Sequence, residues 1–149
     1  MASDSELLTL TETDPARTYK LSQFIKVGRQ APTLSYTDFS YRETHNGISY
    51  VIKNVINDYL PELKKLARKV LLSDKEYEKY KYKPKILSYD LYGNTEYYIY
   101  LLMINDMCNI YEFDSKKLLI IAKSTLNLAL NSIYRSERGN IIEFNNSHT

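Results

Sequence analysis

Few residues of this 149-residue chain could act as a nucleophile, a base or a metal ligand. The two histidines are His45, in a polar stretch predicted to be a loop, and His148, next to the last residue. Neither belongs to a pattern that would place a base beside a serine or cysteine nucleophile. The one cysteine, Cys108, is predicted to pack at a helix end, and a single cysteine excludes an internal disulfide and a multi-cysteine zinc site. The sequence therefore predicts neither nucleophilic catalysis nor a metal site.

Carboxylates are more numerous, and hydrolysis of a glycosidic bond needs only two of them. They are scattered among lysines: Asp74, Glu76, Glu78, Asp90, Glu96, Asp106, Glu112 and Asp114. Spacing alone leaves a glycosidase pair open, but a solvated charged surface explains these residues more simply. The four glycines are dispersed and form no phosphate-binding loop. We expect a protein that is not an enzyme and needs no cofactor.

Composition narrows the class of partner. Charged residues make up 26% of the chain and hydrophobic residues 44%, as in ordinary globular proteins. A net charge of +2 gives no basic excess that would indicate nucleic acid as a partner. No apolar run approaches the roughly 18 residues that cross a bilayer, so no membrane association is expected. The N-terminus lacks a basic segment followed by an apolar one, which favours synthesis in a reducing cytoplasm.

Tyrosine is unusually frequent, with 15 residues and no tryptophan. Its large ring and polar tip suit either the rim of a small core or a surface that becomes buried against a partner. For a single tyrosine both interpretations stay open, and for the set we expect an interface contribution. The predicted interface residues are Tyr36, Phe39, Tyr41, Val55, Tyr59, Leu63, Tyr92, Tyr97, Tyr100, Tyr111 and Tyr134.

The N-terminal half is predicted to form an arm and one long helix. Residues 1–46 show little apolar periodicity and are expected to be an extended or flexible arm. Residues 47–72 carry apolar side chains at spacings of three and four, which predicts an amphipathic helix kinked near Pro61. Its apolar face could pack on the chain's own core or on a neighbour. With the second alternative, Leu63→Asp would leave the domain folded but block its incorporation into an assembly.

Residues 73–123 are predicted to form a compact unit with the order strand, helix, helix, strand. The first strand is expected within 76–84, and the first helix ends at Gly93, which suits a left-handed helix terminus. Asn94 or Thr95 caps the second helix, and the run 116–123 closes the unit as a strand. A helix over 124–137 and a polar tail over 138–149 follow. The predicted core residues are Leu87, Leu91, Tyr98, Leu101, Leu102, Leu119 and Ile121.

Two blocks in this unit resemble a known family. "ILSYDLYGNTEYYIYLLMINDM" at 86–107 and "LLIIAKSTLNLALNSIYR" at 118–135 cover about a quarter of the chain. Their order resembles the lysin-motif (LysM) fold and, more specifically, the small baseplate wedge protein of contractile-tailed bacteriophages. The resemblance implies an α+β fold, with a LysM-like β-α-α-β domain flanked by an N-terminal amphipathic helix, a C-terminal helix and extended terminal arms. The chain departs from the family in its short connection between the blocks, and in Ile99 and Tyr100 where tryptophan is frequent.

The resemblance also implies a function. The chain would be a structural subunit of a phage tail baseplate wedge, made in the host cytoplasm and located in the virion. It would clamp neighbouring proteins together during assembly, and its partners would be other wedge and inner-baseplate proteins and copies of itself around the tail axis, in six-fold order. The alternative is a glycan-binding module, because LysM domains elsewhere bind N-acetylglucosamine polymers. One copy without an export signal favours assembly.

Overall fold

The chain has an α+β fold, as the sequence predicts. The computed structural model describes residues 14–25 and 33–149. Its strands are β1 (Thr18–Lys20), β2 (Ser40–His45), β3 (Ile48–Asn54), β4 (Arg68–Leu71) and β5 (Lys117–Ile120). Its α-helices are α1 (Ile56–Leu66), α2 (Asp74–Tyr80), α3 (Pro84–Tyr92), α4 (Tyr98–Ile104) and α5 (Lys123–Ser147). Short 3₁₀ helices lie at Leu21–Gln23, Tyr36–Phe39, Thr95–Tyr97 and Ile110–Glu112.

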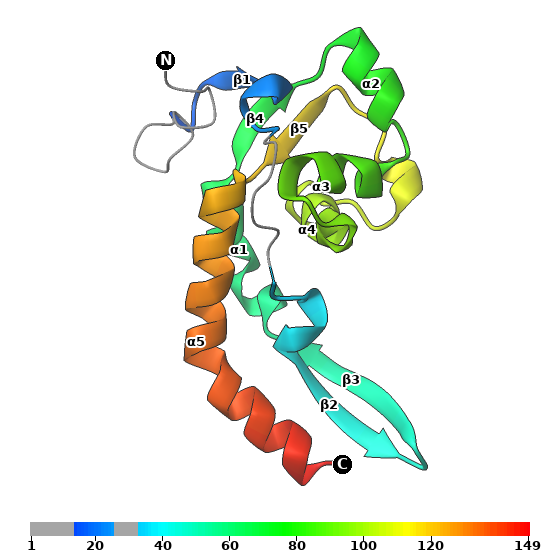
Figure 1. Ribbon diagram of the computed structural model, residues 1–149, viewed down its shortest axis with the longest axis vertical. Coiled ribbons are helices and arrows are strands. Elements are labelled where there is room, and N and C mark those ends of the chain that lie inside the picture. The colour runs from blue at the N-terminus through cyan, green and yellow to red at the C-terminus, as the bar shows by residue number, and fades with distance from the viewer. Residues whose placement is uncertain (1–13, 26–32) are drawn as a thin grey trace.

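The molecule is elongated (Figure 1). One end holds a three-stranded sheet and the helices α2, α3 and α4, while the other end holds the hairpin β2–β3. The sheet has the order β1-β4-β5, with β1 parallel to β4 and β4 antiparallel to β5. Tyr19, Val70 and Leu118 are cross-strand partners and are buried, so one face of the sheet belongs to the core.

Local capping signals determine the helices between β4 and β5. Ser73 begins α2 with a capping box, because its Oγ accepts the backbone N–H of Glu76 while the Glu76 carboxylate accepts the N–H of Ser73. Gly93 ends α3 at φ 74°, and Asn94 caps the 3₁₀ turn that leads into α4. These ends match the prediction. The strand predicted within 76–84 is wrong, since α2 occupies 76–80, α3 begins at Pro84, and the strand that pairs with β5 is β4.

The helix predicted over 47–72 is also wrong, since this stretch contains β3, α1 and β4 in succession. Asn46 and Gly47 both have positive φ values, 54° and 78°, which is the geometry of a two-residue hairpin turn. This turn folds β3 back onto β2. At the end of β3 the Asn54 Oδ1 accepts the N–H of Ile56 at 3.0 Å, which turns the chain into α1. Helix α1 then continues through Pro61.

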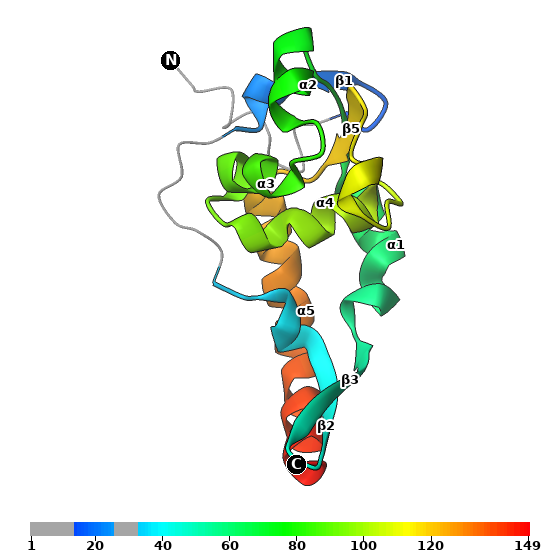
Figure 2. The same cartoon turned by 90° about the vertical axis from the view of Figure 1, so that its right-hand side faces the viewer.

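The C-terminal helix is longer than predicted. α5 has 25 residues and includes most of 138–149, the stretch that was expected to be a polar tail. At about 1.5 Å per residue it is about 37 Å long, and it links the two ends of the molecule. Leu126, Leu130 and Ile133 face the core in its first half, and Ile141 extends the buried stripe beyond them. Figures 1 and 2 show its C-terminal end beside the hairpin.

The described part of residues 1–46 is not a free arm. Tyr19, Leu21, Phe24 and Phe39 are all buried in the main hydrophobic cluster. Residues 1–13 and 26–32, on which the rest of the arm prediction falls, lie outside the described residues. Burial of four large apolar side chains ties these segments to the domain.

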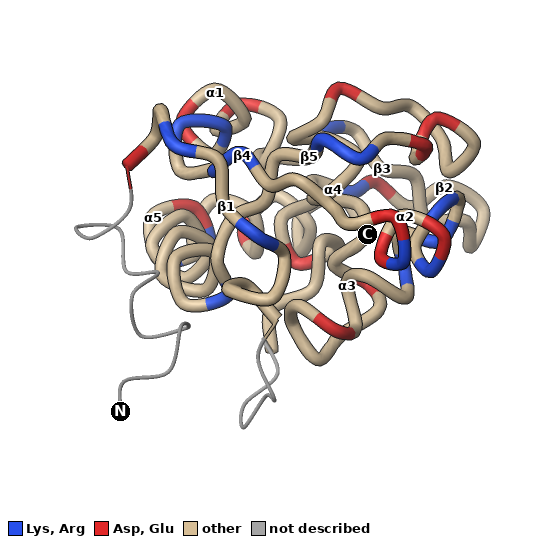
Figure 3. The backbone as a smooth tube through the Cα atoms, turned by 90° about the horizontal axis from the view of Figure 1, so that it is seen from above, with Lys and Arg blue, Asp and Glu red and all other residues tan. Residues whose placement is uncertain are grey.

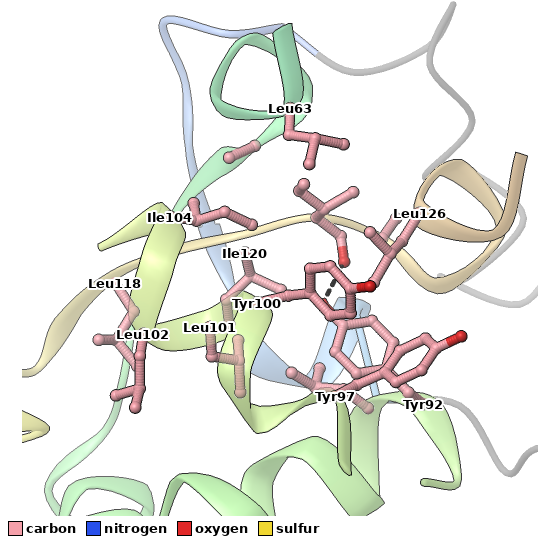
Figure 4. Close-up of a cluster of buried hydrophobic side chains, with 14 of the residues drawn as sticks. Leu63, Tyr92, Tyr97, Tyr100, Leu101, Leu102, Ile104, Leu118, Ile120 and Leu126 are labelled. Atoms are coloured by element: carbon pink, nitrogen blue, oxygen red, sulfur yellow. Dashed lines mark hydrogen bonds between the residues drawn. The ribbon is translucent and has the colours of Figure 1, made fainter. Parts of the chain in front are cut away.

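Aromatic residues form the centre of the core. Tyr97 packs its ring on those of Tyr92 and Tyr100, with centroids 5.8 and 5.2 Å away. Figure 4 shows these three rings meeting aliphatic side chains such as Leu101 and Leu126, so that α3, α4 and α5 share one core. Burial raises the pKa of all three phenols well above the ordinary value. They therefore stay neutral at any physiological pH.

Two of these buried phenols differ in one hydrogen bond and allow a matched test. Tyr92 Oη donates to the backbone oxygen of Ile121 at 2.7 Å, whereas Tyr100 Oη has no partner among the described residues. Tyr92→Phe should lower the free energy of unfolding by about 1–2 kcal/mol, because the Ile121 carbonyl loses its donor. Tyr100→Phe should change it by less than about 0.5 kcal/mol or raise it. Urea denaturation of both variants checks this, and equal losses would contradict it.

Candidate protein-binding surface

Most residues predicted to form an interface lie inside the protein. Phe39, Val55, Leu63, Tyr92, Tyr97 and Tyr100 are buried in the core. Tyr36, Tyr41, Tyr59 and Tyr134 are half-buried and pack against it. The six buried residues are not available to a partner, because their side chains are already in contact with the chain's own core, and the four half-buried tyrosines expose only part of their surface. Among the predicted interface residues only Tyr111 is largely exposed, with 77% of its surface accessible.

Five of the seven predicted core residues lie in the core. Leu87, Leu91, Leu101, Leu102 and Ile121 are buried. Tyr98 and Leu119 are half-buried and pack against the same cluster.

The residues considered for catalysis form no nucleophile–base pair within the described residues, although the two histidines lie at the same end of the molecule, since the N–H of Thr44, next to His45, donates to the His148 oxygen. His45 lies at the end of β2, where its ring is exposed and its Nε2 is 3.3 Å from the Glu43 carboxylate. His148 ends α5 and stacks on Phe144 at 3.9 Å. Cys108 is exposed in the connection between α4 and β5, and its N–H donates to Glu112. Within the described residues, no group of three or more His, Cys, Asp and Glu side chains is arranged to hold a metal ion.

The carboxylates that could have formed a glycosidase pair mostly have structural partners. Asp74 pairs with Lys116, and this hydrogen bond lowers the pKa of the carboxyl group. Asp90 accepts a hydrogen bond from Tyr80, Asp106 pairs with Lys64, and Glu112 accepts the N–H of Asn109. Such contacts cap turns and tether segments. They give a reason for these residues that involves no substrate.

Apolar exposure is concentrated on the hairpin. Ile48, Tyr50, Val51 and Ile52, here called the hairpin surface, are each between 49% and 58% exposed. Four large apolar side chains within five residues of one strand are a local concentration of exposed apolar surface, unlike single exposed apolar residues, which are common. Because side chains alternate along a strand, they are shared between the two faces of β3. The register shift opposite Tyr41 and Arg42 places one extra residue in β3 at this point.

The two edges of the hairpin differ. The outer edge of β2 is covered by the end of α5, since the N–H of Thr44 donates to the His148 oxygen and the N–H of Arg42 donates to Asn145 Oδ1. The Asn145 amide also donates to the Ser40 oxygen at 3.1 Å, and Tyr41 packs on Phe144. β3 pairs only with β2 among the described strands, so its other edge is open. An open edge beside exposed apolar side chains is suited to pairing with a strand of another protein.

The sequence contains a signal for this surface that the prediction missed. Asn46-Gly47 between two runs of strand-forming residues is a strong local indication of a hairpin. The apolar spacing of residues 48–56 also fits a helix, and that interpretation hid the turn. None of the four hairpin-surface residues was among the predicted interface residues.

A second exposed aromatic group lies near α2. The Tyr82 and Tyr111 rings are 6.4 Å apart, and both are exposed. Asp114 accepts hydrogen bonds from Tyr77 and Tyr82. The bond to Asp114 raises the pKa of Tyr77, and Lys81 lies over the rings of Tyr77 and Tyr82. These groups form a polar aromatic platform.

Two further findings concern membranes and similarity to other proteins. Over the part that the structure describes, no helix has the length and apolar character to span a bilayer. Searches against protein-family models, curated proteins and solved structures found no match to this chain.

Proposed function

We propose that this chain is a non-catalytic structural subunit that binds a neighbouring protein through the hairpin surface. The observation that carries the proposal is the exposure of Ile48, Tyr50, Val51 and Ile52 beside the open edge of β3. A two-stranded hairpin is only marginally stable in water by itself. Here α5 supports one edge, and a partner would cover the other edge and the apolar side chains.

The energy available from this surface is enough for a specific contact. Burying a large apolar side chain completely stabilises by about 1.5–3 kcal/mol, so four half-exposed side chains offer about 4 kcal/mol in total. Backbone hydrogen bonds to β3 would add to this and would fix the register of the partner. The contact would extend the hairpin into a sheet of three or more strands.

The specific assembly that we propose is the tail baseplate wedge of a contractile-tailed phage, with the chain located in the virion. This rests on the resemblance of residues 86–107 and 118–135 to the small wedge protein. The antiparallel pairing of β4 with β5, with α3 and α4 between them in the chain, supports a LysM-like arrangement, to which α2 adds a further helix. The partners would be other wedge and inner-baseplate proteins and neighbouring copies around the tail axis.

Quantitative mass spectrometry of purified particles tests this assignment. If the chain is a wedge subunit, tails from the phage that encodes it should contain it in a fixed ratio to the other baseplate proteins, at a multiple of six copies per tail. A chain that is absent from tails, or present in a ratio that varies between preparations, would contradict the assignment.

A glycan-binding module is the second candidate, and the platform of Tyr82, Tyr111 and Asp114 favours it. Exposed aromatic rings beside a carboxylate can stack on sugar rings and accept hydrogen bonds from their hydroxyl groups. Titration of the full chain with N-acetylglucosamine oligomers distinguishes the candidates. Saturable binding that Tyr111→Ala abolishes would support this candidate, and no binding would exclude it.

A further inference from the structure

The outer face of the three-stranded sheet combines lysines with leucines. Tyr19, Val70 and Leu118 point into the core, and because side chains alternate along a strand, the residues on either side of each of them point away from it. Lys20, Leu71 and Lys117 are cross-strand partners in one row, and Thr18, Lys69 and Leu119 are partners in the next row. We call these six residues the lysine–leucine face. Figure 3 looks down on this end of the molecule, where Lys and Arg lie along β1, β4 and β5.

The charges of this face are not neutralised by the described residues. Lys20, Lys69 and Lys117 form no ion pair with any of them, and all three are exposed. Two acidic residues near them along the chain already have partners, because Asp74, five residues after Lys69, pairs with Lys116, and Asp114, three residues before Lys117, pairs with Lys81. The face therefore carries a local positive charge on a chain whose net charge is only +2.

A hollow lies between the lysines. It has a volume of about 570 Å³ and is lined by Thr18, Lys69, Leu71, Asn105, Lys117 and Leu119, together with Val70 and Leu118. Leu71 is 48% exposed there, which is high for a leucine in the middle strand of a sheet. The hollow is large enough for two or three aliphatic side chains of a ligand.

The Asn105 side chain restricts how a ligand could approach. Its Nδ2 donates to the Leu119 oxygen at 2.9 Å, and its Oδ1 accepts the Leu119 N–H at 2.7 Å. These two bonds occupy the outer edge of β5 as a neighbouring strand would. A ligand at this end of the molecule would consequently lie over the sheet face and the adjoining β1 edge, and would not extend the sheet beyond β5.

We propose that the lysine–leucine face binds an acidic, leucine-bearing segment of a partner protein in an extended conformation. Side chains two residues apart on an extended segment point to the same side, so acidic and leucine residues that take turns at every second position would both face the sheet. The carboxylates would meet the lysines, and the leucines would enter the hollow onto Leu71 and Leu119. Nucleic acid fits less well, because a phosphate backbone would leave the apolar hollow unfilled and three lysines provide few phosphate contacts. The hairpin surface lies at the opposite end of the molecule (Figure 1), so this site is independent of the proposed function.

Fluorescence anisotropy with the full chain tests the proposal. The probe is a labelled peptide, acetyl-SESLSESLS-amide, which presents glutamate and leucine on the same side when extended, and its lysine counterpart acetyl-SKSLSKSLS-amide is the negative control. Binding of the acidic peptide should weaken about 10-fold or more in Lys69→Glu/Lys117→Glu, because two attractive contacts become repulsive. Lys69→Gln/Lys117→Gln should give a smaller loss in the same direction. Arg135→Glu/Arg138→Glu, which reverses two exposed charges on α5, should bind like the wild type.

Several outcomes would overturn the proposal. The first is equal affinity of the wild type and the Lys69/Lys117 variants for the acidic peptide. The second is stronger binding of the wild type to vesicles with 30 mol% phosphatidylserine, or to a 20-nucleotide single-stranded DNA, than to the acidic peptide. The third is a concentration-dependent dimer of the chain that the Lys69→Glu/Lys117→Glu variant abolishes. The last result would mean that a second copy of the chain occupies the face. Circular dichroism shows whether each variant is folded. Since the hairpin is unchanged in all of them, their outcome is separate from the test of the proposed function.

Discussion

Leu101→Asp is expected to unfold the chain. Leu101 is fully buried in α4, at the centre of the cluster that α3, α4 and α5 share (Figure 4). An aspartate there removes a large apolar side chain and introduces a carboxylate without a partner, for a combined cost of about 4 kcal/mol or more. That is most of the stability of a typical domain. Far-ultraviolet circular dichroism and urea denaturation measure the effect.

Leu63→Asp should have the same result, which reverses the expectation from the sequence. Leu63 is buried against the chain's own core, so its replacement cannot act on a neighbour alone. The control is Leu128→Asp in α5, because Leu128 is exposed and the substitution should cost less than about 0.5 kcal/mol. A cooperatively folded Leu101→Asp or Leu63→Asp variant would show that the described core is wrong.

Removing the apolar side chains of the hairpin surface should block assembly without unfolding the chain. The variant is Ile48→Thr/Tyr50→Thr/Val51→Thr/Ile52→Thr, which keeps strand-forming residues while it removes the apolar contact. We expect incorporation into particles, or affinity for the isolated partner, to fall at least about 100-fold, since about 4 kcal/mol of apolar burial is lost. The melting temperature should change by only a few degrees.

A matched control removes apolar surface elsewhere. Ile86, Tyr89 and Leu128 are exposed on α3 and α5 to a similar or greater extent, and replacing all three with alanine keeps the helix propensity. This control should be incorporated like the wild type. If the two variants lose incorporation equally, the effect reflects general surface hydrophobicity and not a site on β3.

The parts of the fold that could be predicted are those set by local chemistry. Gly93 ends a helix because its left-handed conformation suits glycine, and Asn94 begins the next turn through its side chain. The apolar run of β5 was recognised in the same way. By contrast, the predicted strand near Tyr77 and Tyr80 turned out to be α2, where the Ser73–Glu76 capping box outweighs the strand propensity of tyrosine. The sheet partners β1 and β4 could not be predicted, since their pairing depends on contacts remote in sequence.

The candidate binding surface was harder to predict, again because it depends on contacts between residues remote in sequence. Tyr92 and Tyr97 were expected at an interface because the large ring and polar tip of tyrosine suit a surface that becomes buried against a partner. The structure provides those acceptors from backbone oxygens of Ile121 and Leu34, 29 and 63 residues away in the sequence, which no local pattern reveals. The hairpin surface was missed because its apolar spacing also fits a helix. Only the Asn46-Gly47 turn distinguishes the two, and it lies outside that spacing.

Hydrogen–deuterium exchange, on the free chain and in assembled particles, tests the central claim most directly. The amides of α4 and of β5 should be protected in both states, because they belong to the core. The amides of β3 that face its open edge should exchange quickly in the free chain and become protected in the particle. If those amides exchange at the same rate in both states, whether fast or slow, β3 does not bind a neighbour and the proposed function is contradicted.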